Sequence, residues 1–344
     1  MEYRKLGNTD IDVSAICLGT MTYGEQNTEE EAHEQLNYAV EQGVNFIDTA
    51  ELYPVPARAE TSGRTEEYIG TWLEQRGKRD DLFLATKICG PGPYTDHIRK
   101  DLDFTSENIK SALEGNLKRL RTDYVDLYQV HWPARSTNYF GKRGYYHRDG
   151  WEDNISSIVE GLDQIVKSGK ARHVGISNET PWGLSQYLRS SERLGLAKIQ
   201  SVQNPYSLLN RTYEVGMAEM SIREEVGLLA YSPMAFGLLS GKYHKKEDTP
   251  QSRINLFERM SRYSSDQCHL ATAKYLEIAE KHGMTLAQMS LAFVTQQRFV
   301  TATIIGASTM AQLKENIDSI NIKLEKNVIK EINKIHEAIP NPAP

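Results

Sequence analysis

The stretch VDLYQVHW, residues 125–132, combines a short β-branched and apolar run with a polar residue, His131, at the point where the run stops. A run of this length is typical of a strand that is buried on both faces. The segment 105–121 precedes it and the segment 154–167 follows it, and in both of them apolar residues recur at helical spacing. This part of the chain therefore predicts a helix, a buried strand and a second helix.

The same alternation continues along the whole chain. We predict eight strands, in the runs 15–18, 45–49, 82–88, 125–130, 173–177, 199–203, 227–232 and 301–305. A short hairpin is predicted before the first of them, from Glu2 to Val13 with its turn at Gly7-Asn8. Strands that alternate with amphipathic helices indicate a parallel sheet with the helices outside.

Polar residues follow six successive runs where each run ends. They are Asp48, Lys87, His131, Asn178, Gln203 and Ser232. In an open sheet these residues would be spread along an edge, whereas in a barrel they converge on one rim, where barrel enzymes place their sites. The pattern therefore favours a (β/α)8 TIM barrel. Two long segments, 132–152 and 236–263, leave the same rim and are predicted to be loops over a pocket.

Capping residues mark where the helices begin and end. Starts are predicted at Thr28/Glu31, Ser264/Gln267, Thr285/Gln288 and Thr309/Gln312, which fit capping boxes, and at Thr180-Pro181. Ends are predicted at Gly43, Gly77, Gly169, Gly195 and Gly283. The tail from Glu325 to Ile339 predicts one more helix. No internal linker is visible, so we expect one domain over residues 1–344.

Composition and charge narrow the class of protein. The chain has 344 residues and a net charge of −6, with its positive residues scattered, which argues against nucleic acid or an anionic membrane as a partner. Its three cysteines, Cys17, Cys89 and Cys268, form no CxxC or Cys/His cluster, so neither a disulfide framework nor a metal site is expected. No signal peptide and no apolar run near ~18 residues is present, and we expect a cytoplasmic protein.

Four residues at or near strand ends form a sufficient set for carbonyl reduction: Asp48, Tyr53, Lys87 and His131. Hydride addition to a carbonyl leaves an alkoxide, which needs a proton at once. A phenol with a pKa near 10 is a poor donor at neutral pH, and burial raises its pKa further. A nearby lysine opposes this, since one charge at ~4 Å supplies about 4 kcal/mol at an effective dielectric of 20. The aspartate can keep the lysine charged, and the histidine can orient the carbonyl oxygen.

The chain resembles the aldo-keto reductase superfamily over nearly its whole length, in particular the bacterial Tas-like branch and the related potassium-channel β-subunit branch. The matching stretches are LGTMTYG, NFIDTAELYP, GRTEEYIG, LATK, LKRLRTDYVDLYQVHWP, HVGISN, VQNPYSLLNR, LAYSPMAFGLLSGKY and IIGASTMAQLKENI. One departure is the segment 54–63 after Tyr53, which is longer than the usual short turn and leaves the pocket wall beside the acid uncertain.

The resemblance implies a role for each matching position. Tyr53 is the expected general acid/base, Lys87 and Asp48 tune it, and His131 orients the carbonyl. The cofactor is expected to be NADPH (NADP+). Its binding residues are Ser177, Asn178, Gln203 and Tyr231 at the nicotinamide, Ser232, Leu238, Ser240 and Lys242 at the pyrophosphate, and Arg253, Ser308, Gln312, Glu315 and Asn316 at the adenosine end. Arg253, Ser308 and Gln312 are expected nearest the 2′-phosphate, with Ser308 and the backbone donors of the last helix free to meet it.

Some of these residues have structural alternatives. Gln312 is also part of a capping box with Thr309, and Arg253 can be a solvated loop cation. The aromatic residues Tyr23, Trp132, Tyr139, Phe140, Tyr145, Tyr146 and Trp151 can line a substrate pocket or pack the long loop on the barrel. Cys89 lies two residues after Lys87, but without a neighbouring cysteine a buried structural thiol is expected.

The function that follows is NADPH-dependent reduction of aldehydes or ketones, with a small-molecule carbonyl substrate. The alternative is a regulatory subunit that binds NADPH and senses redox state with little turnover. A metal-dependent barrel hydrolase lacks its ligand motifs, and a Rossmann dehydrogenase lacks GxGxxG. The sequence leaves the physiological substrate, the direction of the reaction in the cell and the oligomeric state open.

Overall fold

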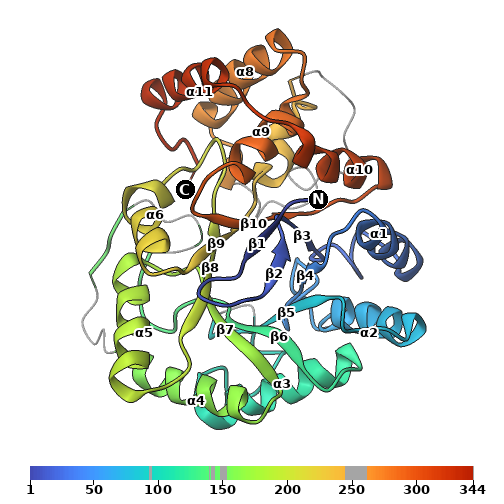
Figure 1. The fold of residues 1–344 in the computed structure, drawn as a ribbon, viewed down its shortest axis with the longest axis vertical. Helices are drawn as coiled ribbons and strands as arrows, with labels where there is room; N and C mark the ends of the chain where they lie inside the picture. The colour runs from blue at the N-terminus through green and yellow to red at the C-terminus, as the bar shows by residue number, and fades with distance from the viewer. Residues whose placement is uncertain (93–94, 139, 141–143, 148–152, 245–261, 344) are drawn as a thin grey trace.

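Eight parallel strands close into a barrel in the computed structural model, which describes residues 1–92, 95–138, 140, 144–147, 153–244 and 262–343. The strands are β3 (Ile16–Gly19), β4 (Phe46–Asp48), β5 (Phe83–Ile88), β6 (Val125–Val130), β7 (Ala171–Ser177), β8 (Ile199–Pro205), β9 (Gly227–Tyr231) and β10 (Val300–Ile305). Each strand pairs with the next, and β10 pairs with β3 (Figure 1). The predicted (β/α)8 TIM barrel is therefore confirmed, with all eight strands at the predicted positions.

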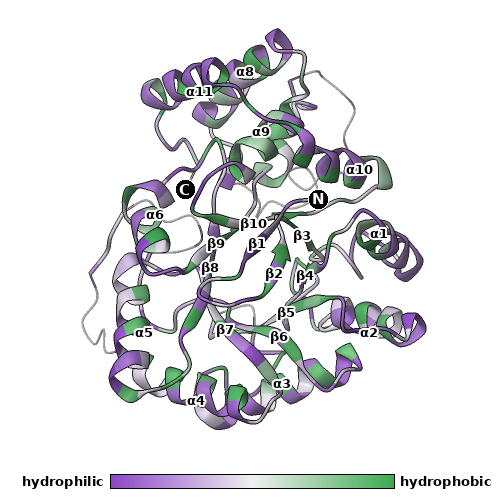
Figure 2. Cartoon of the chain, viewed as in Figure 1, coloured by the Kyte–Doolittle hydropathy of each residue, from purple (hydrophilic) through white to green (hydrophobic). Residues whose placement is uncertain are grey.

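Helices surround this barrel (Figure 1). They are α1 (Glu29–Glu41), α2 (Arg64–Arg76), α3 (Ser106–Leu120), α4 (Ile155–Lys167), α5 (Pro181–Leu194), α6 (Tyr213–Arg223), α8 (Asp266–Lys281), α9 (Leu286–Thr295), α10 (Met310–Asp318) and α11 (Lys326–Ala338), with the short 3₁₀ helices η1 (Ala235–Ser240) and η3 (Ser319–Asn321). In Figure 2 hydrophilic residues lie mainly on the outer sides of these helices. The apolar faces predicted for α3 and α4 are buried against the sheet and neighbouring helices. None of the described helices is both long and apolar enough to cross a membrane.

Most of the predicted helix boundaries are confirmed, and two are corrected. The capping boxes at Thr28 and Thr285 form in full, and Thr180 caps α5. Helix α8 is capped by Ser265 rather than by Ser264. At α10, Thr309 accepts a hydrogen bond from the Gln312 backbone N–H, but the Gln312 side chain bonds Ser308 instead of closing the box. The five glycines at predicted helix ends all have positive φ.

The N-terminal hairpin closes one end of the barrel. Its strands β1 (Tyr3–Lys5) and β2 (Asp12–Ser14) pair antiparallel, as predicted. Leu6 and Val13 join the apolar cluster inside the barrel, where the Phe46 and Phe83 rings pack edge to face with centroids 5.0 Å apart. Phe46 and Phe83 are the first residues of their strands, so this apolar end lies opposite the rim where the strands stop.

Candidate active site

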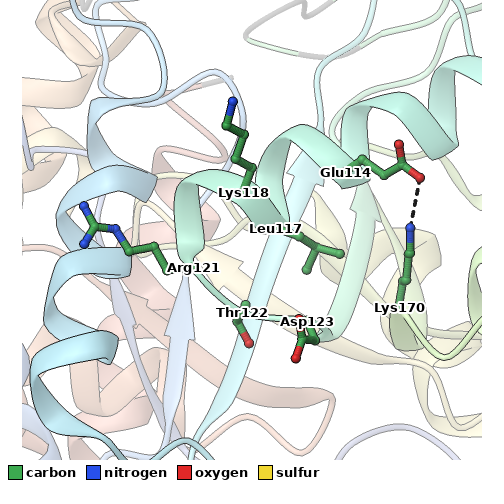
Figure 3. Close-up of a pocket in the computed structure, with 7 residues that line it drawn as sticks. All are labelled: Glu114, Leu117, Lys118, Arg121, Thr122, Asp123 and Lys170. Carbon is green, nitrogen blue, oxygen red and sulfur yellow. Dashed lines mark hydrogen bonds and ion pairs between the residues drawn. The ribbon is translucent and has the colours of Figure 1, made fainter.

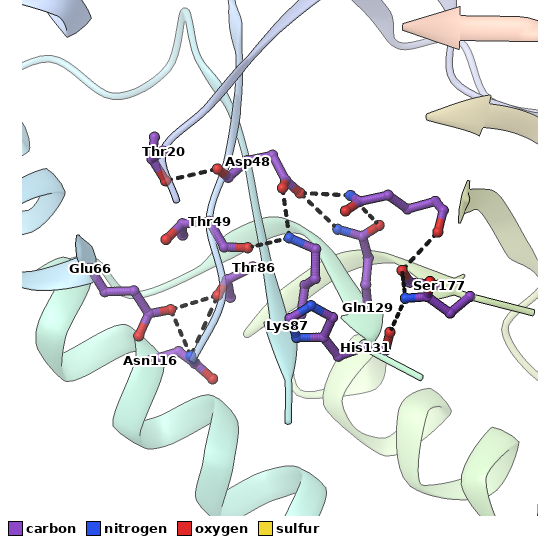
Figure 4. Close-up of polar contacts among 12 residues, drawn as sticks. Thr20, Asp48, Thr49, Glu66, Thr86, Lys87, Asn116, Gln129, His131 and Ser177 are labelled. Carbon is purple, nitrogen blue, oxygen red and sulfur yellow. Dashed lines mark hydrogen bonds and ion pairs between the residues drawn. The ribbon is translucent and has the colours of Figure 1, made fainter. Parts of the chain in front are cut away.

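The Lys87–Asp48 ion pair lies at the rim of the barrel where the strands end. Successive side chains of a strand point to opposite faces, so Lys87 shares the inward face of β5 with Phe83 and Ala85. Its ammonium donates to Asp48 Oδ2 at 2.6 Å and to the Thr49 carbonyl at 2.7 Å (Figure 4). Burial alone lowers the pKa of Lys87, but Asp48 and Tyr53 raise it by more, and the net pKa is raised. The contacts with Asp48 and Tyr53 therefore favour the charged form of this buried lysine.

Two glutamine side chains complete the hydrogen bonding of Asp48. Gln129 Nε2 and Gln203 Nε2 donate to Asp48 Oδ1 at 3.1 and 2.9 Å. Gln129 had not been predicted as a site residue. It lies two residues before His131, on the same face of the chain, and is paired in register with Lys87, a signal the sequence pattern does contain. Lys87, Gln129 and Gln203 thus form four hydrogen bonds, three to the Asp48 carboxylate and one to the Thr49 carbonyl, which hold the ion pair in place before any ligand arrives.

Tyr53 lies beside this ion pair. The Lys87 ammonium is 4.9 Å from the centroid of the Tyr53 ring. The ring is half-buried, and the chain around it is held by backbone bonds from Tyr53 N–H to Ala50 and from Gly63 N–H to Tyr53. The segment 54–63 is tied to the loop after β3 by a bond from Val55 N–H to the Met21 carbonyl. The segment after Tyr53 is therefore fixed at both of its ends by backbone bonds.

His131 completes the group. Its ring centroid is 5.8 Å from that of Tyr53, with the two rings nearly perpendicular. Burial, and to a lesser extent the Lys87 charge, hold the pKa of His131 well below its usual value, so the imidazole is neutral. Its Nδ1 atom is buried and has no hydrogen-bond partner among the described residues. A buried nitrogen without a partner is costly, and a polar ligand atom in this space removes that cost.

Asn178 connects His131 to the neighbouring strand ends. Its Nδ2 donates to the His131 carbonyl at 2.9 Å and to Ser177 Oγ at 3.0 Å, and its Oδ1 accepts the Tyr231 hydroxyl at 2.6 Å. Asn178 Oδ1 retains one acceptor site, and no described residue donates to Gln203 Oε1. Two amide oxygens that can accept from a primary amide fit the carboxamide of a nicotinamide ring.

The turn after β9 brings together the residues expected at the pyrophosphate. Ser240 Oγ donates to the Gly237 carbonyl at 2.8 Å, and the Lys242 ammonium lies 5.3 Å from the Tyr243 ring centroid. The Leu238 side chain is fully buried, so only its backbone can face a ligand. Ser232 has a positive φ, as have Ala235 and Phe236, and the turn is compact enough to offer its backbone to an anion.

The described residues expected at the adenosine end lie around α10, and each of them has a hydrogen-bond partner within the protein. Ser308 N–H and Oγ both donate to Gln312 Oε1, at 3.0 and 3.1 Å. The expectation that Ser308 is free is therefore wrong in this structure. Its N–H and hydroxyl both donate to the Gln312 side-chain amide, which does not close the capping box. Glu315 accepts from Thr285 Oγ1, and Asn316 Nδ2 donates to the Gly306 carbonyl. Arg253 lies outside the described residues.

A second polar network, absent from our predictions, supports β5 from behind. Thr86 lies on the opposite face of β5 from Lys87, and its hydroxyl donates to Glu66 Oε1 (Figure 4). Glu66 is fully buried and also accepts from Asn116 Nδ2 and Arg119 Nε, both at 2.7 Å. The sequence does contain a sign of this network, because Glu66 lies on the same helix face as Ile69 and Leu73. A charged residue on an apolar helix face is rarely left unpaired.

The aromatic residues singled out in the sequence differ in their exposure. Tyr23 is fully buried and bonds Gln35, Trp132 is nearly buried and bonds the Pro91 carbonyl, and Phe140 is 43% exposed. Tyr145 and Tyr146 are exposed, while Tyr139 and Trp151 lie outside the described residues. Cys89 is fully buried, and burial raises its pKa, so it is an unreactive thiol as expected.

A surface pocket of about 390 Å³ lies elsewhere (Figure 3). It is lined by Glu114, Leu117, Lys118, Arg121, Thr122, Asp123 and Lys170. Thr122 and Asp123 precede β6 and Lys170 precedes β7, so the pocket opens at the N-terminal end of the strands. It is therefore separate from the Lys87–Asp48 ion pair at the other end of the strands.

Comparison with known proteins agrees with this geometry. The model of the Aldo/keto reductase family matches residues 15–337. The chain is 48% identical to "Protein tas" of Escherichia coli over the full length of both chains. It is 29% identical to a "Probable voltage-gated potassium channel subunit beta" of Arabidopsis thaliana, over 94% of this chain and 92% of the relative. It is 27% identical to "Aldo-keto reductase yakc [NADP(+)]" of Schizosaccharomyces pombe, over 96% and 89%. The chain belongs to the aldo/keto reductase family of oxidoreductases.

Proposed function

We propose that this protein reduces aldehydes and ketones to alcohols with NADPH, and that Tyr53 is the proton donor. The observation that carries the proposal is the buried Lys87–Asp48 pair beside Tyr53. The His131 ring lies next to the same phenol ring, and its Nδ1 has no partner among the described residues. A carbonyl oxygen between Tyr53 and His131 would meet a proton donor and a neutral hydrogen-bonding ring together.

The residues divide the chemistry between them. When bound, the reduced nicotinamide supplies the hydride to the carbonyl carbon. Tyr53 gives its phenolic proton to the carbonyl oxygen as negative charge develops there. The Lys87 cation stabilises the phenolate that remains, and Asp48 keeps Lys87 in place. The neutral His131 can donate one hydrogen bond to the same oxygen and so orients the carbonyl.

The oxygens of Asn178 and Gln203 support the choice of a nicotinamide cofactor, because both can accept from its carboxamide. Lys242 and the turn after β9 would hold the pyrophosphate, and Ser232 and the Leu238 backbone belong to the same turn. Tyr231 would stack on the nicotinamide ring, with Ser177 at the carboxamide. The printed name of the yeast relative specifies NADP(+), which favours the phosphorylated cofactor.

Selection of the 2′-phosphate is assigned to Arg253, Ser308 and Gln312, with Glu315 and Asn316 at the adenine. Binding there requires Ser308 to exchange its two bonds with Gln312 for bonds to phosphate oxygens. A charge-assisted contact to a guanidinium contributes about 1.5–3 kcal/mol, so Arg253→Ala should weaken NADPH binding about 10- to 100-fold and hardly change NADH binding. Fluorescence titration of both cofactors tests this, and equal losses for the two would assign the 2′-phosphate to other residues.

The test of the function is a panel of aldehydes, ketones and sugars assayed by NADPH absorbance, before and after exhaustive treatment with a chelator. We expect steady turnover that survives the chelator. The second candidate, a redox-sensing subunit, is favoured by the similarity to a channel subunit and predicts only slow, single oxidation of bound cofactor. Activity that disappears with the chelator and returns only with added metal would contradict the proposed mechanism.

A further inference from the structure

Arg262 lies at the catalytic rim between aromatic rings of two different loops. Its guanidinium carbon is 5.8 Å from the centroid of Phe140, in the loop after β6, and 5.8 Å from that of Phe236, in η1 after β9. Contacts of this length between a guanidinium and an aromatic face are favourable. Arg262 as a whole is half-buried, so the residue is not sealed from solvent.

These contacts join Arg262 to both sides of the site described above. On one side, the Phe140 ring lies 5.7 Å from Trp132, whose ring lies 4.9 Å from His131. On the other side is Tyr231: burial raises the pKa of this phenol, and Arg262 is the strongest influence that lowers it. Tyr231 bonds Asn178, and Asn178 bonds the His131 carbonyl. Arg262 is therefore linked to His131 from this side as well.

Arg262 differs in its charge partners from three other arginines near strand ends of this rim. Arg58 pairs with Glu25 at 3.1 Å and Arg99 with Glu51 at 3.3 Å, while Arg135 forms a two-pronged ion pair with Glu179. Within the part of the chain that the structure describes, no carboxylate makes an ion pair with Arg262. The Tyr231 and Tyr263 hydroxyls also interact with the guanidinium. A guanidinium has five N–H donors, more than two phenols engage, so donors remain for a planar anion.

We infer that Arg262 binds an anionic group, most simply a carboxylate, carried by the carbonyl substrate. The preferred substrates are then aldehydes or ketones with a negative charge at a distance from the carbonyl carbon. This inference rests on the proposed reductase function and narrows its substrate class. Arg262 acts on specificity through substrate binding and takes no part in the proton transfer.

The test compares 4-carboxybenzaldehyde with its methyl ester, which has a similar shape and no charge. In Arg262→Met, we expect kcat/KM for the acid to fall about 10- to 100-fold, as for loss of a charge-assisted bond, and kcat/KM for the ester to change by less than about threefold. Arg262→Lys should retain part of the preference, because it keeps the charge without the planar fork. Arg58→Met is the matched control, since Arg58 already has a carboxylate partner, and should leave the ratio unchanged.

Two further measurements separate the possible causes. Titration with NADPH should give the same Kd for wild type and Arg262→Met; a weaker Kd with an unchanged acid-to-ester ratio would assign Arg262 to the cofactor phosphates and overturn the inference. Equal losses for acid and ester would also overturn it and leave only a role in loop packing. Binding of both compounds, followed by tryptophan fluorescence, tests the preference without turnover, so absence of reduction would count against the proposed function alone.

Discussion

The two ends of the barrel interior are built from the same strands but by different chemistry. At the hairpin end, Leu6, Val13, Phe46 and Phe83 are apolar and at most 3% exposed. Two to four residues further along the same inward faces come Asp48 and Lys87, which are equally buried but charged. In β4 and β5 the two ends are therefore equally buried, and the charged residues come where these two strands end. Barrel enzymes separate stability from chemistry in this way.

The two ends should also respond differently to mutation. An apolar layer loses stability in proportion to the volume removed, and its remaining members still pack. In the polar layer, Asp48 accepts hydrogen bonds from Lys87, Gln129 and Gln203, so removing one partner leaves a buried charge without compensation. Changes at the catalytic end should therefore affect both folding and turnover, and changes at the hairpin end should affect folding alone.

The largest effect is expected for Lys87→Met, which leaves the Asp48 carboxylate unpaired. We expect turnover to fall at least ~10²-fold, because the phenol loses its cation, and the free energy of unfolding to fall by about 3–5 kcal/mol. The double variant Asp48→Asn/Lys87→Met removes both charges and should regain most of the stability but none of the turnover. Urea unfolding and an NADPH absorbance assay measure both quantities. A double variant as unstable as the single one would contradict the ion-pair account.

Leu6→Ala tests the opposite end of the barrel. Leu6 is fully buried in the inner cluster, and truncation of such a leucine costs about 2–5 kcal/mol. The catalytic group lies at the other end of the strands, so kcat/KM per folded molecule should stay within about twofold of wild type. If kcat/KM falls tenfold in fully folded protein, the two ends are coupled and the division proposed here is wrong.

A smaller effect is expected from the pH dependence of stability at His131. Its folded pKa lies well below the usual value because of burial and then Lys87. Above about pH 6.5 both states are neutral, while below it the unfolded chain binds a proton that the folded protein does not, so stability falls with falling pH by up to about 1.4 kcal/mol per unit. His131→Gln should lose this part of the slope between pH 7 and 5, and Leu6→Ala should keep it. Equal slopes in wild type and His131→Gln would mean that His131 is protonated in the folded protein.

Much of the fold follows from the sequence for a local reason. Each strand is a short apolar run that stops where a polar residue such as Lys87 or Asn178 begins. Each strand can therefore be predicted from its own residues alone. Barrel closure is not local. It depends on pairing of Val300–Ile305 with Ile16–Gly19, nearly 300 residues apart, and only the convergence of polar strand ends indicated it.

The sequence predicted which residues lie at the site better than it predicted the hydrogen bonds between them. Asp48, Tyr53, Lys87 and His131 come together as expected from strand ends on one rim. The hydrogen-bond partners of the site residues could not be predicted in this way. Gln129 on β6 bonds Asp48 on β4, two strands away. The Gln312 side chain bonds Ser308 and does not close the capping box with Thr309. Arg262 was missed because a lone arginine after a long loop has no periodic pattern to place it. Such choices depend on side-chain geometry in three dimensions.

The most direct test of the central claim, that Tyr53 protonates the carbonyl oxygen, is the single-turnover rate of NADPH oxidation by an uncharged aldehyde in wild type and Tyr53→Phe. Phenylalanine keeps the ring beside Lys87 and His131 and removes only the hydroxyl. We predict a fall of at least ~10²–10⁴-fold, as for loss of general acid catalysis, with the Kd for NADPH within about threefold of wild type. A variant that keeps a tenth or more of the wild-type rate would show that the proton comes from another group.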